Sequence, residues 1–473
     1  MLTLADVLEA LTGTWLEAAS LSISEAAIDS RQVIPASMFV ALPGERVDGH
    51  NYVDAAFQRG AGLALVQQDL SARFPTVDLR SGCLTPDFTV PQPPFCLLVN
   101  DSLQALQASA AHWRRKLDVR VIGITGSIGK STTKELTAEV LSQRYHTLKN
   151  AGNPNNEIGL PLTLLRLGRG HERAVMEMGF YTPGEIKFLC DLALPSIGVI
   201  TNVGTVHAER AGSQEAIAHG KAELVEALPA SPAGCAVLNY DDPWVRPMAE
   251  KTSASVFYYG LDSNAHLWAD EIVSMGLSGI HFTLHYGSEA MRIRVPMIGE
   301  HSVHTVLRAA AVGLIEGLSW PEIIRGLQMG HAQLRLVATH TPNGALILDD
   351  TYNASPESTL AALNLLNELP GRRIAVLGDM LELGPYEKQG HEIVGVRAAE
   401  VARVLVAVGE RGKMIAEAAR QSGMGASQVH WAPSVTEVVE LLTAMLQPDD
   451  VVLVKGSHSL RMERIVSALE VAS

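Results

Sequence analysis

The stretch 119–134 constrains the fold of this chain more than any other, because it predicts a strand, a glycine-rich turn and a helix in that order. Residues 119–124 are a β-branched run typical of a buried strand. The glycines that follow let the backbone turn tightly and bring its N–H groups close to an anion. The residues from Lys130 onward favour a helix, whose N-terminal dipole points at the same spot. The stretch therefore predicts a phosphate-binding loop.

The loop also carries the side chains that nucleotide binding requires. Lys130 is placed to reach the β- and γ-phosphates, and the Ser131 hydroxyl is placed to ligate Mg²⁺. The strict pattern has a small residue where this chain has Ile124, so the loop is a variant. A glycine-rich turn that binds nothing is the alternative interpretation. The residues expected around the phosphates are Thr125, Gly126, Ser127, Ile128, Gly129, Lys130, Ser131 and Thr132.

Length, charge and cysteine content narrow the class of protein. A chain of 473 residues exceeds one hydrophobic core, so we expect two to four domains. The net charge of −14 disfavours nucleic acid and anionic membranes as partners. The four cysteines lack metal-binding spacing and are expected to be reduced thiols. The acidic N-terminus is unlike a signal peptide, and no apolar run is long enough to span a bilayer. We expect a cytoplasmic monomer without membrane insertion.

Residues 1–108 alternate short apolar strands with turns, which predicts a small α/β domain with a helix near 52–59. Residues 68–95 are rich in proline and are expected to form an irregular surface excursion. Polar residues gather in the loops of this domain, where they either bind a ligand or are simply solvated. The candidates are Ser30, Arg31, Gly44, Gly49 and His50.

Residues 109–335 repeat strand and helix, as in a doubly wound sheet. In such sheets ligands bind outside the carboxyl ends of the strands. Lys130, Glu177 and the stretch 202–207 are all expected at that edge, which is the main argument for a single site. Residues 253–295 alternate with period two and predict antiparallel strands on the flank of this domain.

Three residues and one loop of this domain are candidates for a functional role. Glu177 is either a Mg²⁺ ligand or a solvated loop carboxylate. His207 is either a metal or substrate contact or a structural histidine. Lys221 lies in a helical run, where an exposed lysine is the ordinary expectation. The amide-rich stretch 150–159 is a candidate substrate loop, because buried amides must be hydrogen-bonded.

Residues 336–473 contain four apolar strands that end in Asp, Gly or Lys and are separated by helical segments. This pattern predicts a second, Rossmann-like sheet. The predicted strands are 345–350, 373–378, 404–409 and 450–456.

These motifs resemble the Mur ligases of bacterial cell-wall synthesis. The resemblance rests first on 125–135, 152–161, 177–179 and 202–207. The stretches 349–356, 376–384 and 454–463 are most similar to the family member that adds a dipeptide, and 29–31 and 39–46 match its N-terminal domain. The resemblance therefore covers nearly the whole chain.

The resemblance implies an α/β protein of three domains: a UDP-sugar domain at 1–108, an ATP domain at 109–335 and a dipeptide domain at 336–473. It implies an ATP-dependent amide ligase that joins UDP-muramoyl-tripeptide to D-alanyl-D-alanine through an acyl phosphate. Another Mur ligase, folylpolyglutamate synthase and a non-catalytic nucleotide-binding protein are the alternatives. The N-terminal domain and residues 377–383 argue against the first two.

The resemblance also implies a role for each site residue. Lys130 is expected to hold ATP phosphates, Ser131 and Glu177 one Mg²⁺, and His207 with a carbamylated Lys221 a second Mg²⁺. Arg335 is expected at the γ-phosphate and Asp350 at the ribose. The expected substrate contacts are Ser30, Arg31, Gly44, Gly49, His50, Asn155, Asn156, Tyr352, Asn353, Asp379, Lys455 and Ser457.

One motif departs from the family pattern, which usually reads Gly-x-His-Asn-x-x-Asn. Residues 299–305 of this chain read Gly-Glu-His-Ser-Val-His-Thr, so Ser302 and Thr305 take the places of both asparagines. The usual adenine contacts are therefore in doubt, and both residues are kept as candidate ATP contacts.

Overall fold

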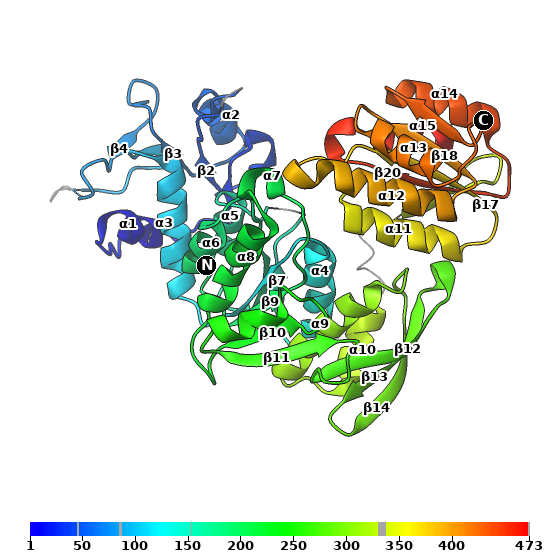
Figure 1. The fold of residues 1–473 in the computed structure, drawn as a ribbon. Coiled ribbons are helices and arrows are strands. Elements are labelled where there is room, and N and C mark those ends of the chain that lie inside the picture. The colour runs from blue at the N-terminus through cyan, green and yellow to red at the C-terminus, as the bar shows by residue number, and fades with distance from the viewer. Residues whose placement is uncertain (45–46, 85–87, 153, 330–336, 472–473) are drawn as a thin grey trace.

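The computed structural model describes residues 1–44, 47–84, 88–152, 154–329 and 337–471. It contains three sheets, which follow one another along the chain. In Figure 1 the N-terminal and C-terminal units lie on opposite sides of the larger middle unit. This is the expected three-domain α/β architecture.

The N-terminal sheet is wholly parallel and has the strand order β1-β2-β3-β5-β4. Its strands are β1 (Ala26–Ala27), β2 (Met38–Val40), β3 (Leu63–Val66), β4 (Thr76–Asp78) and β5 (Phe95–Leu98). Its helices are α1 (Leu4–Thr12), α2 (Val53–Gln58) and α3 (Ser102–Arg115). The stretch 68–95 is not wholly irregular as predicted, because β4 pairs with β5 there as a short, half-exposed edge strand.

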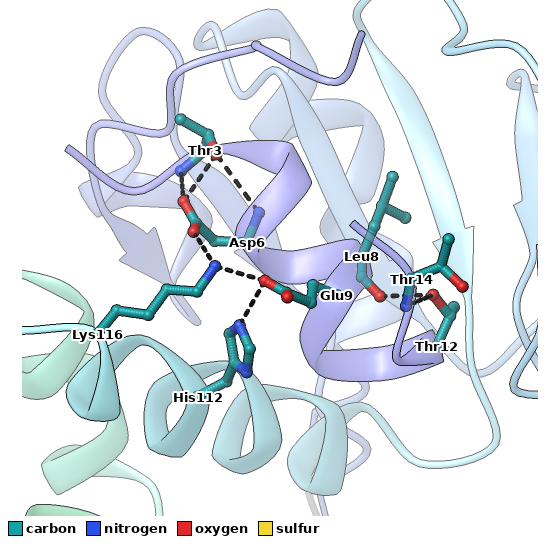
Figure 2. Close-up of polar contacts among 8 residues, drawn as sticks. All are labelled: Thr3, Asp6, Leu8, Glu9, Thr12, Thr14, His112 and Lys116. Atoms are coloured by element: carbon teal, nitrogen blue, oxygen red, sulfur yellow. Dashed lines mark hydrogen bonds and ion pairs between the residues drawn. The ribbon is translucent and has the colours of Figure 1, made fainter. Parts of the chain in front are cut away.

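A polar network fastens α1 to α3 (Figure 2). Nζ of Lys116, at the end of α3, lies 2.9 Å from Asp6 and also pairs with Glu9. His112 Nε2 lies 2.9 Å from the same Glu9 carboxylate. Because β6 begins shortly after Lys116, this network connects the N-terminal unit to the strand that leads into the phosphate loop.

The middle sheet has the order β14-β13-β12-β11-β10-β9-β6-β8-β7, with the phosphate-loop strand β6 between β8 and β9. Its strands are β6 (Arg120–Thr125), β7 (Thr147–Lys149), β8 (Arg173–Glu177), β9 (Ile197–Ile200), β10 (Cys235–Asn239), β11 (Ser255–Gly260), β12 (Leu267–Ser274), β13 (Ile280–Tyr286) and β14 (Glu289–Val295). Its helices are α4 (Lys130–Leu141), α5 (Gly159–Leu165), α6 (Glu185–Ala193), α7 (Ala208–Ala211), α8 (Gln214–Glu226), α9 (Ser302–Ile315) and α10 (Trp320–Gln328).

Both faces of the central strands are covered by helices. Val121 of β6 packs in one core with α3, α5, α6 and α8, whereas the next residue, Ile122, packs in another with α4, α9 and α10. A strand buried on both faces reads as a continuous apolar run, which is why the sequence revealed it.

The prediction of antiparallel strands over 253–295 is confirmed for β12, β13 and β14 and wrong for β11. Strand β11 is parallel to β10 and to the first residues of β12. A 3₁₀ segment (Arg246–Lys251) lies in the connection from β10 to β11, which crosses over instead of forming a hairpin.

The C-terminal sheet has the order β15-β16-β20-β17-β18-β19, and only its edge strand β15 is antiparallel. Its strands are β15 (Val337–His340), β16 (Leu346–Asp350), β17 (Arg372–Gly378), β18 (Val404–Val408), β19 (Val429–Ala432) and β20 (Asp450–Lys455). Its helices are α11 (Pro356–Glu368), α12 (Glu387–Val401), α13 (Gly412–Gln421), α14 (Val435–Met445) and α15 (Glu463–Val471). The four predicted strands are confirmed. The two edge strands were missed because they are short and partly exposed.

Helix α3 runs across position 108 without a break. Within the described parts of the chain, no helix has the length and apolar character needed to cross a lipid bilayer.

Candidate active site

The phosphate loop lies between the end of β6 and the start of α4, as predicted. Gly126 and Gly129 have φ values of +144° and +80°, which side-chain-bearing residues rarely adopt. A Cβ on Gly126 would lie 1.8 Å from Thr201 Oγ1, so this position accepts only glycine. Lys130 Nζ donates to the carbonyls of Gly126 at 2.9 Å and Ser127 at 3.2 Å, across the mouth of the loop.

The end of β9 holds this loop in shape. The Ile128 N–H donates to Asn202 Oδ1 at 3.0 Å, and Thr201 Oγ1 donates to the Ile128 carbonyl at 2.7 Å. The Gly204 N–H donates to Ser127 Oγ at 2.8 Å. The stretch 201–204 therefore forms a second wall of the phosphate site, at the strand edge where the sequence placed it.

Glu177, at the end of β8, is buried beside the start of α4. The Ser131 hydroxyl donates to its Oε2 at 2.7 Å, and the Asn155 amide donates to its Oε1 at 2.9 Å. The interpretation of Glu177 as a solvated carboxylate is wrong, because the side chain is enclosed by two polar partners. A hydroxyl and a carboxylate in contact next to a phosphate loop are a suitable donor pair for a hard cation.

The amide-rich stretch 150–159 is bound mainly to the protein itself. The buried Lys134 ammonium donates to the carbonyls of Asn150 and Gly152, each at 2.8 Å. Asn150 Oδ1 accepts the Glu177 N–H at 3.0 Å, and Asn156 Oδ1 accepts the Gly159 N–H at 3.0 Å, at the start of α5. This loop thus supports Glu177 and α5, and only Asn155 of the predicted pair lines the cavity described below.

His207 immediately precedes α7 and has a φ of +71°. Its Nδ1 lies 2.7 Å from Oε2 of Glu382, which belongs to the C-terminal unit. Burial, and then the charges of Lys130 and Lys221, lower the pKa of His207 to about 3. The imidazole is therefore neutral at physiological pH and can act as a ligand.

The helical pattern around Lys221 predicted an exposed lysine, and this prediction is wrong. Its side chain is only 1% exposed on α8, and its Nζ lies 4.8 Å from the centre of the Phe180 ring. Burial, with a further contribution from Lys130, lowers the pKa of Lys221 well below its usual value. This shift favours the neutral, nucleophilic form of the amine relative to a lysine in water.

A cavity of about 470 Å³ opens between the middle and C-terminal units. The predicted residues that line it are Ser127, Ile128, Gly129, Lys130, Thr132, Asn155, Glu177, His207, Ser302, Thr305, Asp350, Tyr352, Asn353 and Lys455. Residues that were not predicted as site residues also line it: Tyr181, Val206, Met297, Ile298, His301, Ala354, Ser355, Ser358, Ala361 and Ala362. Val206, His301, Ala354 and Ser355 lie within the quoted motifs at 202–207, 299–305 and 349–356. The small residues of α11 that line the cavity carry no local signal and join the site only through the fold.

Two C-terminal residues of the cavity form an ion pair. Lys455 Nζ lies 2.6 Å from Asp350 Oδ2 and donates to the Asn353 carbonyl at 2.9 Å. The other two predicted contacts of this unit lie outside the cavity lining. Asp379 accepts the Gly412 N–H at 2.8 Å, and Ser457 Oγ accepts the Leu381 N–H at 3.0 Å, so both hold neighbouring loops.

The five predicted residues of the N-terminal unit also lie away from this cavity. His50 is buried, its Nδ1 is 2.6 Å from Asp48, and its Nε2 accepts the Gln67 N–H at 2.8 Å. The Arg31 guanidinium is exposed and pairs with Asp29. Ser30 is buried and Gly44 is exposed. The Gly49 N–H donates to the Leu42 carbonyl. The predicted contact Arg335 lies outside the described residues.

At the start of α9, the hydroxyls of Ser302 and Thr305 already have hydrogen-bond partners within the protein. Ser302 Oγ donates to the Ile298 carbonyl at 2.7 Å, and Thr305 Oγ1 accepts from Arg308 Nη2 at 2.7 Å. Burial lowers the pKa of the adjacent His301 to about 4, so this ring is neutral. Ser302 Oγ therefore keeps only acceptor sites and Thr305 Oγ1 keeps its single donor, which is fewer groups than two asparagine amides would offer a purine edge.

We therefore expect weak discrimination between purines. GTP should support turnover within about 100-fold of ATP, because that factor corresponds to two well-made hydrogen bonds. Ser302→Ala should change the ratio of kcat/KM for ATP and GTP less than about threefold. A GTP deficit well beyond 100-fold would contradict this expectation and show that other groups read the base.

A divalent cation would have to use a mixed set of ligands here. Among the residues that the structure describes, no three His, Cys, Asp or Glu side chains converge on one point. The oxygens available are the Ser131 hydroxyl and the Glu177 carboxylate, and the phosphates of a nucleotide would supply the rest. This donor set fits Mg²⁺, which typically binds through one or two carboxylates and substrate phosphates.

Three family models match the chain. They are the Mur ligase middle domain over residues 124–313, the Mur ligase glutamate ligase domain over 334–458 and the Mur ligase family catalytic domain over 22–78. The curated UDP-N-acetylmuramoyl-tripeptide–D-alanyl-D-alanine ligase of Escherichia coli (strain K12) is 34% identical over 473 residues, covering 99% of this chain and 98% of the relative.

Solved structures show the same similarity over nearly the full length. A crystal structure of MurF from Acinetobacter baumannii is 30% identical, has a TM-score of 0.83 and covers 98% of each chain. The MurF ligase from Thermotoga maritima in complex with ADP is 26% identical, has a TM-score of 0.77 and covers 94% of this chain and 97% of its own.

Proposed function

This chain belongs to the Mur ligase family, and we propose that it joins D-alanyl-D-alanine to UDP-N-acetylmuramoyl-tripeptide in an ATP-dependent step of peptidoglycan synthesis. The similarity to ligases of that activity along nearly the whole chain is the observation that carries the proposal. The cavity supports it, because a phosphate loop and the C-terminal ion pair of Asp350 and Lys455 face the same space.

The chemistry begins with a carboxylate, which is a poor acyl donor. In-line attack of the tripeptide carboxylate on the γ-phosphoryl group of ATP forms an acyl phosphate and releases ADP. The amine of the dipeptide then attacks the acyl carbon, and the tetrahedral intermediate collapses with loss of phosphate. Lys130 spreads the negative charge that develops on the transferred group. The walls from two units exclude water that would otherwise hydrolyse the acyl phosphate.

We further propose two Mg²⁺ sites in this cavity. Ser131 and Glu177 would hold one ion, and His207 with a carbamylated Lys221 would hold the other. Bound Mg²⁺ neutralises phosphate charge and helps to align the attacking and leaving oxygens. The support is the contact between Ser131 and Glu177, the neutral ring of His207 and the buried amine of Lys221.

The three units suit the three ligands. We propose that residues 1–108 bind the UDP sugar, 109–335 bind ATP and 336–473 bind the dipeptide. In the first unit the UDP-sugar contacts would be Ser30, Arg31 and the loop carrying Gly44 and Gly49, with the enclosed His50 stiffening that loop. In the third unit Tyr352, Asn353 and Lys455 would face the dipeptide. Asp379 and Ser457 would support the loops around it.

We propose a monomer in the cytoplasm. The four cysteines are unpaired, as expected for a reducing compartment.

A phosphate-release assay tests the substrate assignment. ATP, UDP-muramoyl-tripeptide and D-alanyl-D-alanine together should release phosphate, and omission of either acceptor or donor should reduce the rate to background. Crossing several UDP-muramoyl peptides with several amines defines both specificities. Equal or faster turnover with single amino acids such as D-glutamate would assign the chain to another step of the family.

A further inference from the structure

A short loop of the middle unit, residues 203–209, lies between the phosphate loop and the C-terminal unit. On one side, the Gly204 N–H donates to Ser127 Oγ of the phosphate loop at 2.8 Å. On the other side, two carboxylates of the C-terminal unit reach the same loop. Glu357 accepts the Thr205 N–H at 3.2 Å, and Glu382 contacts His207 at 2.7 Å.

Glu382 is held firmly in place for this contact. Its backbone has a φ of +63°, and its carbonyl accepts the Glu209 N–H at 3.3 Å. The neighbouring Gly384 lies so close to the loop that a Cβ there would be 2.7 Å from Glu209 Cα. The backbone around Glu382 is thus held against residues 208–209, which immediately follow His207.

The hydrogen bond determines which nitrogen of His207 carries the proton. A carboxylate only accepts, so Nδ1 must be the donor, and the lone pair of the neutral ring is then on Nε2. No residue in the described part of the chain hydrogen-bonds to Nε2, and the ring lines the ATP cavity. The bare nitrogen is therefore free to meet a ligand in that cavity.

We propose that Glu382 is a positioning residue that orients His207 toward a divalent cation in the cavity. This inference rests on the proposed function, in which His207 is a Mg²⁺ ligand. Carboxylate–imidazole–metal arrangements fix the ring orientation and raise the basicity of the ligating nitrogen. Because Glu382 comes from the C-terminal unit, the middle unit acquires the oriented ligand only when the two units are docked. The C-terminal unit, which is proposed to bind the dipeptide, thereby orients a ligand of the proposed Mg²⁺ site next to ATP.

The test measures Mn²⁺ binding directly, so that it does not depend on activity. Free Mn²⁺ is followed by electron paramagnetic resonance with β,γ-methylene ATP present, in the wild type and in five variants. These are Glu382→Ala, Glu382→Gln, Glu357→Gln, His207→Ala and the double variant His207→Ala/Glu382→Ala. Thermal unfolding of each variant verifies that it is folded.

We expect Glu382→Ala to weaken one Mn²⁺ site by about 10- to 100-fold. Glu382→Gln should weaken it less, because the amide oxygen still accepts from Nδ1 but carries no charge. Glu357→Gln is the matched control, since it contacts the same loop through Thr205 without touching His207, and it should stay within about twofold of wild type. The double variant should bind Mn²⁺ no more weakly than His207→Ala alone, since the two residues act as one unit.

The outcomes separate this inference from the function it rests on. If His207→Ala weakens Mn²⁺ binding and Glu382→Ala does not, the positioning role of Glu382 is wrong while the metal site stands. If His207→Ala leaves both sites unchanged, the proposed metal role of His207 fails first. If Glu357→Gln weakens binding as much as Glu382→Ala, docking of the units alone explains the effect and the inference is overturned.

Discussion

Lys221→Ala is expected to lower kcat by about 100- to 1,000-fold, the range observed when one preorganised electrostatic contact is removed from an active site. Binding of the UDP sugar should stay within about twofold of wild type, because its proposed site lies in the N-terminal unit. Steady-state kinetics and a binding titration measure the two quantities on the same preparation.

The environment of Lys221 is the reason for this expectation. An ammonium beside Mg²⁺ would repel the ion, whereas CO₂ adds to a neutral amine and releases a proton, leaving a carbamate with two hard oxygen ligands. Burial lowers the pKa of this lysine and so favours the neutral amine. A nearby cation then stabilises the carbamate, which would otherwise lose CO₂ in water.

Three comparisons sharpen the test. Lys221→Arg should be as inactive as the alanine variant, because a guanidinium stays charged and forms no carbamate. Excess acetate or formate should restore part of the activity of Lys221→Ala by supplying a carboxylate at the vacated position. Lys187→Ala removes an exposed lysine of the adjacent helix α6 and should be neutral. Full activity in Lys221→Ala, or no ¹³C carbamate signal from wild type under ¹³CO₂, would contradict the modification.

Glu177→Gln is expected to reduce turnover about 1,000-fold and to raise the Mg²⁺ concentration needed for half-maximal rate. The charge that would hold the cation is lost, and the buried amide cannot accept from Ser131 and Asn155 at both of its ends. The NH₂ group of the new glutamine then faces the donor of either Ser131 or Asn155, and this unsatisfied contact costs about 1–3 kcal/mol of folding free energy. Chemical denaturation measures the second effect separately from the kinetics.

Glu172→Gln, near the start of the same strand, is the matched control, because Glu172 is exposed and lies outside the cavity lining. It should leave kcat and the Mg²⁺ dependence within about twofold of wild type. If Glu177→Gln lowers stability but its residual activity has an unchanged Mg²⁺ dependence, the carboxylate is structural and the proposed first metal site is wrong.

The sequence alone determined the elements whose signals are local. The run of β-branched residues, the glycines and the helix from Lys130 predicted β6, the phosphate loop and α4, because each depends on neighbours within a few residues. The four strongly apolar strands of the C-terminal sheet were predicted for the same reason. The family motifs extended this information to the activity, since they preserve side chains at fixed local spacing.

The tertiary structure decided everything that depends on distant segments. The helical pattern around Lys221 favours exposure, yet packing of α8 against α6 and the sheet buries it and lowers the pKa of its amine. Ser302 and Thr305 put the usual adenine contacts in doubt from the sequence, and only the structure shows which protein groups their hydroxyls contact. His207 and Glu382 are 175 residues apart and meet only because two separately folded units dock. Local patterns carry no record of such a contact, since it forms only when the hydrophobic cores of both units are complete.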